Sequence, residues 1–350
     1  MRAVSTIASA VALGSISLLA ACSSNSSAWA PFAPGVSPTG GAVPHASKNG
    51  SPLATCTLVR HLRGRAAGSR DAKPLAATPY LYVADDCEPA IDVLHAKTYA
   101  ELGHIYSDVS SSVADVTLDS KGNLYATNST GFGSENGNIT EYAPGNWGEA
   151  SFVYNANISA PTAVAVDTRG NVYEADEDGF INEYSQAQNI SIASCSLELG
   201  GAFGVAVDSS NDVFVSARIF GLPSELVEWP GGLNDCQDQT VLALPGGAVG
   251  GGMAVDRGGN LLIANSAEQD VEVVDASSGY SSVDHTIGSN FVCPDTVRLN
   301  KANTLVFVTD SCADTVTVVN YPSGTNAIVL GTDYGISEPR GAVEQPNAVY

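Results

Sequence analysis

Short apolar runs alternate with polar turns along most of the chain, and they recur as a repeated pattern from about residue 78 onward. In each copy, apolar residues alternate before an acidic residue or Asn, and Gly or Asn follows three positions later. The copies are VTLDSKGNLYATN from Val116, VAVDTRGNVYEAD from Val164, VAVDSSNDVFVSA from Val205, MAVDRGGNLLIAN from Met253, VRLNKANTLVFVTD from Val297 and GAVEQPNAVY from Gly341. Alternation with a period of two in runs this short indicates β-strands joined by tight turns.

The anchor residues of the repeat define its period. They are the pairs Asp119/Gly122, Asp167/Gly170, Asp208/Asn211, Asp256/Gly259, Asn300/Asn303 and Glu344/Asn347. Successive anchors lie 48, 41, 48, 44 and 44 residues apart, a period typical of four-stranded propeller blades. We expect the anchor carboxylate to accept hydrogen bonds from turn N–H groups, while Gly or Asn adopts the left-handed conformation of the hairpin. The repeated acids therefore predict turn capping rather than ligand binding.

The two ends of the repeat region are incomplete in a complementary way. The strand expected at residues 80–85 has no first strand before it, and the last repeat stops after its own first strand and turn. Pairing the two ends would complete one blade and remove an open sheet edge. The sequence thus predicts an all-β fold over residues 76–350, a six-bladed β-propeller closed by pairing of its N- and C-terminal strands. Residues 348–350 partly compete with the strand at Tyr80 for the same position.

The repeats resemble those of the NHL and YVTN propeller families over residues 78–350. The NHL-like copies read AVDTRGNVYEAD and AVDSSNDVFVSA, and the YVTN-like segments read LYVADDCEPAIDVL and VFVTDSCADTVTVVN. The resemblance implies the propeller fold. It does not specify one function, because such propellers include binding platforms, lyases and lactonases.

The first 75 residues follow a different pattern. Residues 1–21 join Arg2 to an apolar run too short to span a bilayer, which is typical of an export signal. The sequence Leu19-Ala20-Ala21-Cys22 resembles the lipobox of bacterial lipoproteins. The resemblance implies lipidation of Cys22 and, because Ser rather than Asp follows, an outer-membrane location facing the periplasm or the surface. An ordinary secretory signal is the alternative. Residues 22–75, rich in Ser, Ala, Pro and Gly, are expected to form a disordered tether.

Charge divides the chain at the same place. The whole chain carries a net charge of −22, yet residues 1–75 hold seven basic residues and one acid, which leaves residues 76–350 at −28. Such an acidic body excludes nucleic acid as a partner, because phosphate binding needs clustered Lys and Arg. The basic stretch Val59–Lys73 could contact anionic lipid or the acidic body, or stay solvated. We expect a monomer attached to the membrane through its lipid alone.

The cysteines other than Cys22 are even in number. In an exported protein this predicts structural disulfides, and no CxxC spacing suggests a zinc or redox site. The pairing is left open among fifteen connectivities. The candidates are Cys56, Cys87, Cys195, Cys236, Cys293 and Cys312.

One face of the predicted propeller collects acidic residues. In a propeller the loops between second and third strands share a face with the connections between blades, and acids there attract cations or a basic partner. The candidate partner-binding residues are Asp85, Asp86, Glu135, Asp176, Asp178, Asp270, Asp310 and Asp314.

Glu174, Asp176 and Asp178 form the sharpest local motif. Alternating carboxylates followed by Gly179 resemble the start of a calcium loop, and calcium is the candidate cofactor. Ser185 stands where the loop pattern needs a bidentate Glu, and a polar hairpin turn explains the same residues.

Catalytic signatures are weak. The body histidines His95, His104 and His285 are expected on third or fourth strands, away from the channel, and no GxSxG motif occurs. We therefore expect a non-catalytic binding or scaffold module at the cell envelope. The alternative is a calcium-dependent lactonase or lyase whose metal ligands end second strands at the channel mouth: Asn128, Asp176, Asn265 and Asp310. A purely structural envelope protein is a third option.

Overall fold

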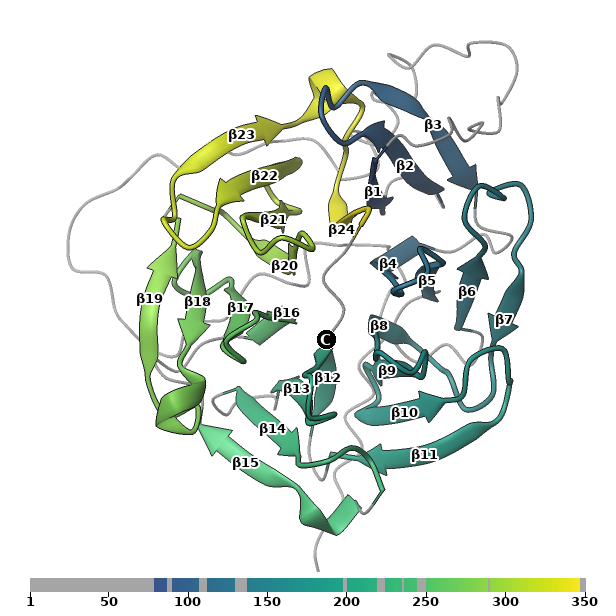
Figure 1. The fold of residues 1–350 in the computed structure, drawn as a ribbon, viewed down its shortest axis with the longest axis vertical. Helices are drawn as coiled ribbons and strands as arrows, with labels where there is room; N and C mark the ends of the chain where they lie inside the picture. The colour runs from purple at the N-terminus through teal and green to yellow at the C-terminus, as the bar shows by residue number, and fades with distance from the viewer. Residues whose placement is uncertain are drawn as a thin grey trace, which may run out of the picture.

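The computed structural model describes residues 79–86, 90–106, 112–129, 137–197, 200–218, 224–234, 236–243, 250–288 and 290–346. These residues form six four-stranded antiparallel sheets. The sheets surround a central axis as the blades of a propeller (Figure 1). The predicted six-bladed, all-β fold is therefore confirmed. The predicted signal, residues 1–21, and the predicted tether, residues 22–75, lie outside the described residues.

Five blades follow the chain in order, each running from an inner to an outer strand. Blade 2 consists of β4 (Ser112–Leu118), β5 (Leu124–Ser129), β6 (Asn138–Tyr142) and β7 (Phe152–Tyr154). Blade 3 consists of β8 (Pro161–Val166), β9 (Val172–Asp176), β10 (Phe180–Tyr184) and β11 (Ser191–Ser196). Blade 4 consists of β12 (Gly201–Val207), β13 (Val213–Arg218), β14 (Glu225–Trp229) and β15 (Thr240–Ala243).

The remaining blades complete the ring. Blade 5 consists of β16 (Gly250–Val255), β17 (Leu261–Asn265), β18 (Asp270–Val274) and β19 (Val283–Ile287). Blade 6 consists of β20 (Pro294–Leu299), β21 (Leu305–Asp310), β22 (Thr315–Asn320) and β23 (Asn326–Leu330). Blade 1 joins both chain ends, with β24 (Pro339–Glu344) beside β1 (Tyr80–Asp85), β2 (Ala90–His95) and β3 (Glu101–Tyr106). Short 3₁₀ helices lie at Cys236–Asp238 (η2), Ala276–Ser278 (η4) and Thr332–Tyr334 (η5).

The ring closes through blade 1, as predicted. Strand β24 is antiparallel to β1, with Leu81 opposite Glu344 and Tyr82 opposite Val343. The residues expected to compete for this position, 348–350, lie outside the described part of the chain. Because both ends of the sheet region are paired with each other, the innermost strand of blade 1 is supplied by the last repeat.

The anchor residues of the repeat cap the turns between first and second strands. The Asp119 carboxylate accepts hydrogen bonds from the N–H groups of Lys121 at 2.9 Å and Asn123 at 2.8 Å, and Gly122 has φ +86°. The same bonds recur at the anchors Asp167, Asp208 and Asp256. The turn-capping interpretation is therefore confirmed for these anchors.

Apolar side chains between neighbouring blades form the core. In the interface of blades 1 and 2, Tyr80 and Tyr82 pack edge-on against Trp147, with ring centroids 4.8 and 5.9 Å apart. Such aromatic pairs contribute roughly 0.5–1.5 kcal/mol each beyond the burial of their area. Each blade thus depends on its neighbours for a complete core.

Two of the predicted disulfides are present. Cys195 of β11 is bonded to Cys236 of η2, which joins blade 3 to blade 4. Cys293, just before β20, is bonded to Cys312 in the loop after β21. Both bonds are compatible with export to an oxidising compartment. Cys22, Cys56 and Cys87 lie outside the described residues.

Candidate functional site: the loop face and the central channel

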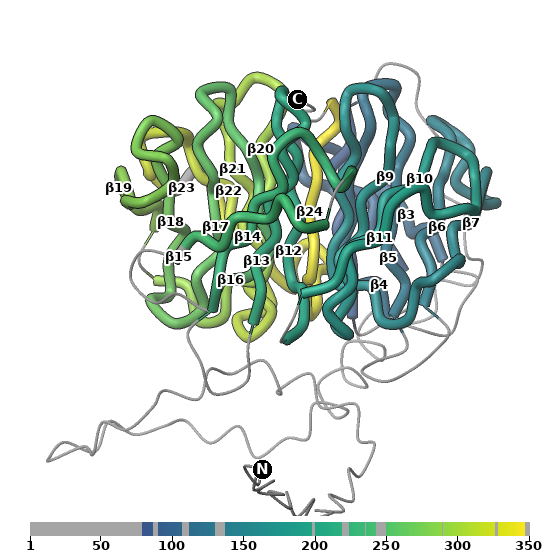
Figure 2. The backbone as a smooth tube through the Cα atoms, turned by 90° about the horizontal axis from the view of Figure 1, so that it is seen from below, coloured from purple at the N-terminus to yellow at the C-terminus, as the bar shows by residue number. Residues whose placement is uncertain are grey.

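The propeller has two different faces. The loops between second and third strands lie beside the connections between blades, and we call this end the loop face. The anchor turns lie at the opposite end, which we call the turn face. Figure 2 shows the ring from the side, with its strands running between these two ends.

Three of the predicted carboxylates on the loop face are buried. Asp85, Asp176 and Asp310 end second strands and are 1–2% exposed. The Asp176 carboxylate accepts the N–H groups of Ser159 at 2.8 Å and Ala160 at 2.9 Å. These bonds hold the incoming connection between blades against the end of the second strand.

Asp310 repeats the arrangement in blade 6. It accepts the N–H groups of Val292 at 2.6 Å and Cys293 at 2.9 Å. Asp85, Asp176 and Asp310 each lie opposite a Pro that begins the first strand: Pro339, Pro161 and Pro294. This Pro–Asp pairing is a signal that the repeats in the sequence contain. For Asp176 and Asp310, the hydrogen bonds show that the carboxylate supports the incoming connection.

Other candidate acids remain accessible on the loop face. Asp178 is exposed, and Asp270 and Asp314 are half-buried. Their neighbour Glu177 is half-buried too, and burial together with the nearby Asp176 and Asp178 raises its pKa to about 7. Asp86 is neutralised by Arg340, whose guanidinium lies 2.8 Å away. Glu135 lies outside the described residues. Fewer acidic side chains are therefore accessible on the loop face than the sequence suggests.

The carboxylates of the calcium-like motif accept hydrogen bonds from neighbouring residues. The Asp176 carboxylate also accepts the N–H of Asp178 at 2.8 Å, and Asp178 accepts the Ser159 hydroxyl at 2.8 Å. Glu174 is fully buried and accepts a bond from Asn182 at 2.8 Å. Among the described residues, no group of three or more His, Cys, Asp or Glu could hold a metal ion. Calcium binding stays a prediction that the motif alone supports.

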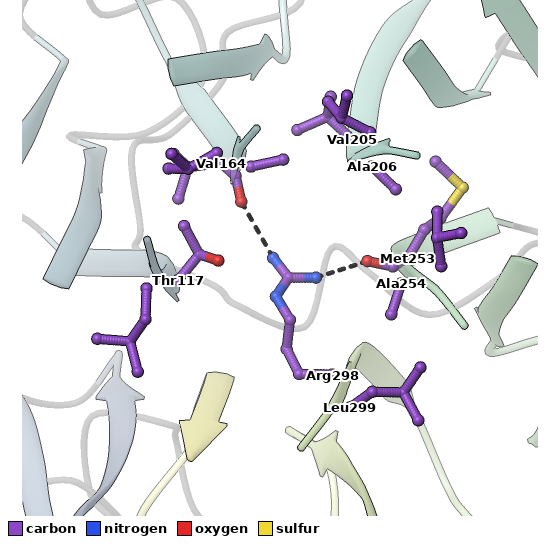
Figure 3. Close-up of a pocket in the computed structure, with 13 residues that line it drawn as sticks. Thr117, Val164, Val205, Ala206, Met253, Ala254, Arg298 and Leu299 are labelled. Carbon is purple, nitrogen blue, oxygen red and sulfur yellow. Dashed lines mark hydrogen bonds between the residues drawn. The ribbon is translucent and has the colours of Figure 1, made fainter. Parts of the chain in front are cut away.

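A buried ion pair crosses the central channel. Arg298 of β20 forms an ion pair with Asp115 of β4. Its guanidinium also donates to the Val164 carbonyl at 3.3 Å and to the Met253 carbonyl at 2.7 Å. Figure 3 shows Arg298 lying between these inner strands. One side chain thereby connects the first strands of blades 2, 3, 5 and 6.

The space beside Arg298 is small. The cavity has a volume of about 50 Å³ and is lined by the ends of first strands, among them Thr117, Val166 and Leu299. Binding sites for small organic ligands typically have several hundred Å³, so this cavity has room for a few water molecules only. The sequence did not reveal this ion pair, because no local motif surrounds Asp115 or Arg298.

The four residues predicted as metal ligands of a lactonase form hydrogen bonds within their own blades. Asn128 donates to Asn138 at 2.8 Å and to Thr140 at 3.1 Å. Asn265 donates to Glu272 at 2.9 Å. Asp176 and Asp310 support loops, as described above.

The body histidines lie on outer strands. His95 ends β2, His104 lies in β3 and His285 lies in β19, as the repeat pattern predicts. His104 is 2.7 Å from Asp92 and 3.0 Å from Glu101. The hydrogen bond to Asp92, followed by that to Glu101, raises the pKa of His104 to about 10. This histidine is a structural cation on the outside of blade 1.

Comparison with known proteins supports the fold alone. No family model and no curated protein sequence matches the chain. Among solved structures, a chain of a nidogen–laminin complex superimposes with a TM-score of 0.61 at 13% identity, covering 77% of this chain and 99% of that chain. A protein of unknown function from Bacteroides caccae gives a TM-score of 0.60 at 9% identity, with the same coverage. The chain is a six-bladed β-propeller, a fold that does not by itself specify one function.

Within the described part of the chain, no helix is both long enough and apolar enough to cross a bilayer.

Proposed function

We propose that the protein is an exported, lipid-anchored binding or scaffold module of the cell envelope that acts without catalysis. The lipobox-like sequence around Cys22 supports the outer-membrane anchor, and the two disulfides support an oxidising compartment. The partner is a protein or other ligand with basic groups, bound at the loop face. The propeller body acts as a monomer and does not contact the membrane directly.

One observation carries this proposal above all. The loop face presents accessible carboxylates such as Asp178 and Glu268, whereas the channel is blocked by Arg298 and Asp115. Accessible acids on a body with a charge of −28 produce a field that steers cationic partners toward this face. Because the channel is blocked, we infer that a ligand binds to the loop face rather than inside the central channel.

A charge-matched pair of variants tests the loop face. The double variant Asp178→Asn/Glu268→Gln removes two exposed acids from the loop face, and Glu149→Gln/Asp284→Asn removes two exposed acids elsewhere. Partners captured from envelope extract by the wild type should be lost with the first variant and kept with the second. Equal loss in both variants would show attraction to net charge rather than to this face.

The anchor is tested separately. Cys22→Ser should abolish incorporation of labelled fatty acid and release the protein from the outer-membrane fraction. A Cys22→Ser protein that still takes up label would refute lipidation at this position.

Calcium provides the test of the enzymatic alternative. A ligand that binds only the folded state raises its stability by mass action. A calcium-dependent rise in unfolding temperature that is lost in Asp178→Asn would support a metal site at Glu174, Asp176 and Asp178, and would call for a lactone-hydrolysis assay. An unchanged unfolding temperature in calcium and in excess chelator would leave the binding module as the function.

A further inference from the structure

A groove runs along the outer wall of the ring between blades 3 and 4. Its volume is about 420 Å³, and its walls include Glu183 of β10, Ile192 and Ser194 of β11, and Leu233 and Asn234 after β14. This volume lies in the range of sites that hold a small ligand or a long side chain. The groove is distant in the fold from the acids of the loop face, because Arg169 and Asn171 of an anchor turn also line it.

Glu183 is a buried carboxylate with one oxygen available to the groove. Its exposed fraction is 6%. Oε1 accepts bonds from Asn171 at 2.9 Å and from the Tyr173 hydroxyl at 3.0 Å. No described residue donates a hydrogen bond to Oε2. Oε2 is therefore free to accept a hydrogen bond from a ligand in the groove, and a bond from an ammonium or guanidinium group to a carboxylate is stronger than one between neutral groups.

The charge of Glu183 is not cancelled by the nearby cation. Arg169 lies in the same groove, but its Nε and Nη2 are each 2.8 Å from the carboxylate of Asp167. The three groups therefore carry a net negative charge, and they belong to a body of −28. The groove favours an ammonium or guanidinium group over an anion.

Strand β11 offers a second kind of contact beside the groove. Among the described residues it is the last strand of its sheet and pairs with β10 alone, and Figure 1 shows it on the outer rim. Alternate N–H and C=O groups of such an edge point away from the sheet and can pair with another strand. Ile190 and Ile192 are 68% and 52% exposed, so the edge also presents apolar surface.

The groove wall is held in place by covalent and apolar contacts. The Cys195–Cys236 disulfide joins β11 to η2, and Leu233 is 1% exposed in the core shared by blades 3 and 4. A preformed site binds more tightly than one that must be ordered by its ligand.

We propose that β11 and this groove bind an extended, Lys- or Arg-containing segment of a partner protein. The segment pairs its main chain with the open edge of β11, packs an apolar side chain on Ile192, and places a cationic side chain against Glu183 in the groove. This mode of recognition combines strand addition, which contributes affinity, with a side-chain pocket, which contributes specificity. The proposal does not depend on the loop face.

A synthetic peptide tests the proposal on the full-length protein. The probe is a ten-residue peptide of alternating Val and Lys, compared with one of alternating Val and Glu, and affinity is measured by calorimetry. Glu183→Gln and Ile192→Lys should each weaken binding of the Val-Lys peptide by at least about tenfold. The Val-Glu peptide should not bind.

Matched controls separate this site from general attraction to an acidic protein. Val241→Lys adds the same charge on β15, where Val241 is 53% exposed, and Asp284→Asn removes one exposed charge as Glu183→Gln does. Both controls should change the affinity less than about twofold. The proposal is overturned if the controls weaken binding as much as the test variants, or if Glu183→Gln binds normally. It is also overturned if binding appears only after Arg60 and Arg63 are replaced, because the chain's own basic segment would then occupy the groove. Thermal unfolding of each variant checks that the fold is retained.

Discussion

At the residue scale, the most consequential feature is the ion pair of Arg298 and Asp115. Asp115 is completely buried and accepts N–H bonds from Val116 at 2.8 Å and Val164 at 3.1 Å as well as the guanidinium of Arg298. A buried pair contributes modest net stability, because desolvation offsets the attraction, but loss of one partner leaves an uncompensated charge. Each of the two residues therefore needs the other to compensate its buried charge.

We expect Arg298→Met to lower the free energy of unfolding by about 3–5 kcal/mol, because Asp115 is left buried without its cation. The double variant Arg298→Met/Asp115→Asn should recover part of this loss. Urea unfolding of the wild type, both single variants and the double variant measures the coupling. Strictly additive losses would contradict an energetic link between the two residues.

Glu272 supplies a pH dependence at the same scale. Its carboxylate is nearly buried, accepts one bond from Asn265 at 2.9 Å, and has no donor at Oε2. Burial raises the pKa of Glu272 to about 7 from 4.5. A folded-state pKa above the unfolded value means that the folded protein holds its proton more tightly, so the stabilisation is complete below pH 4.5 and is lost as pH rises through 7.

Between pH 4.5 and 8, the wild type should therefore lose about 1–3 kcal/mol of stability relative to Glu272→Gln, which cannot titrate. Urea unfolding of both proteins across this range checks the sign and the size. Parallel pH profiles for the two proteins would show that Glu272 is ionised equally easily in both states.

At the element scale, glycines set how closely the inner strands approach one another. A Cβ on Gly204 of β12 would lie 2.4 Å from the Gly251 carbonyl oxygen of β16. A methyl group there must push two first strands apart. The narrow channel that Arg298 spans depends on this close approach.

Gly204→Ala should destabilise the protein by about 1–3 kcal/mol through overpacking. The control is Gly148→Ala, where an added Cβ meets nothing within 4 Å; it should be neutral or slightly stabilising. Chemical denaturation of the two variants compares them directly. Equal effects would mean that the β12–β16 contact relaxes without cost.

At the scale of the whole molecule, the ring is closed by the pairing of β24 with β1, and one disulfide, Cys195–Cys236, joins two neighbouring blades. Cys195–Cys236 and Cys293–Cys312 use four of the six candidate cysteines. We expect the two remaining candidates, Cys56 and Cys87, to pair with each other.

Thiol titration tests this expectation on unfolded, unreduced Cys22→Ser protein. We expect no reactive thiol in that protein and one reactive thiol after Cys56→Ser. Two reactive thiols in the parent protein would show that Cys56 and Cys87 stay reduced.

The sequence alone determined the blade count, the anchor turns and the closure at β24 and β1. These features follow from interactions between near neighbours: an Asp such as Asp167 bonds N–H groups two and four residues away, and apolar alternation marks each strand locally. The positions of His104 and His285 on outer strands followed from the same repeat.

Tertiary structure alone decided the chemistry of the site. Asp115 and Arg298 are separated by 183 residues and meet only because the ring closes. Asp176 and Asp310 looked like ligands for a partner, yet their carboxylates bond the connection that enters each blade. The groove at Glu183 exists only where two blades adjoin. The physical reason is that turn capping and strand alternation act within a few residues, whereas channel, groove and face are each made by strands from different repeats.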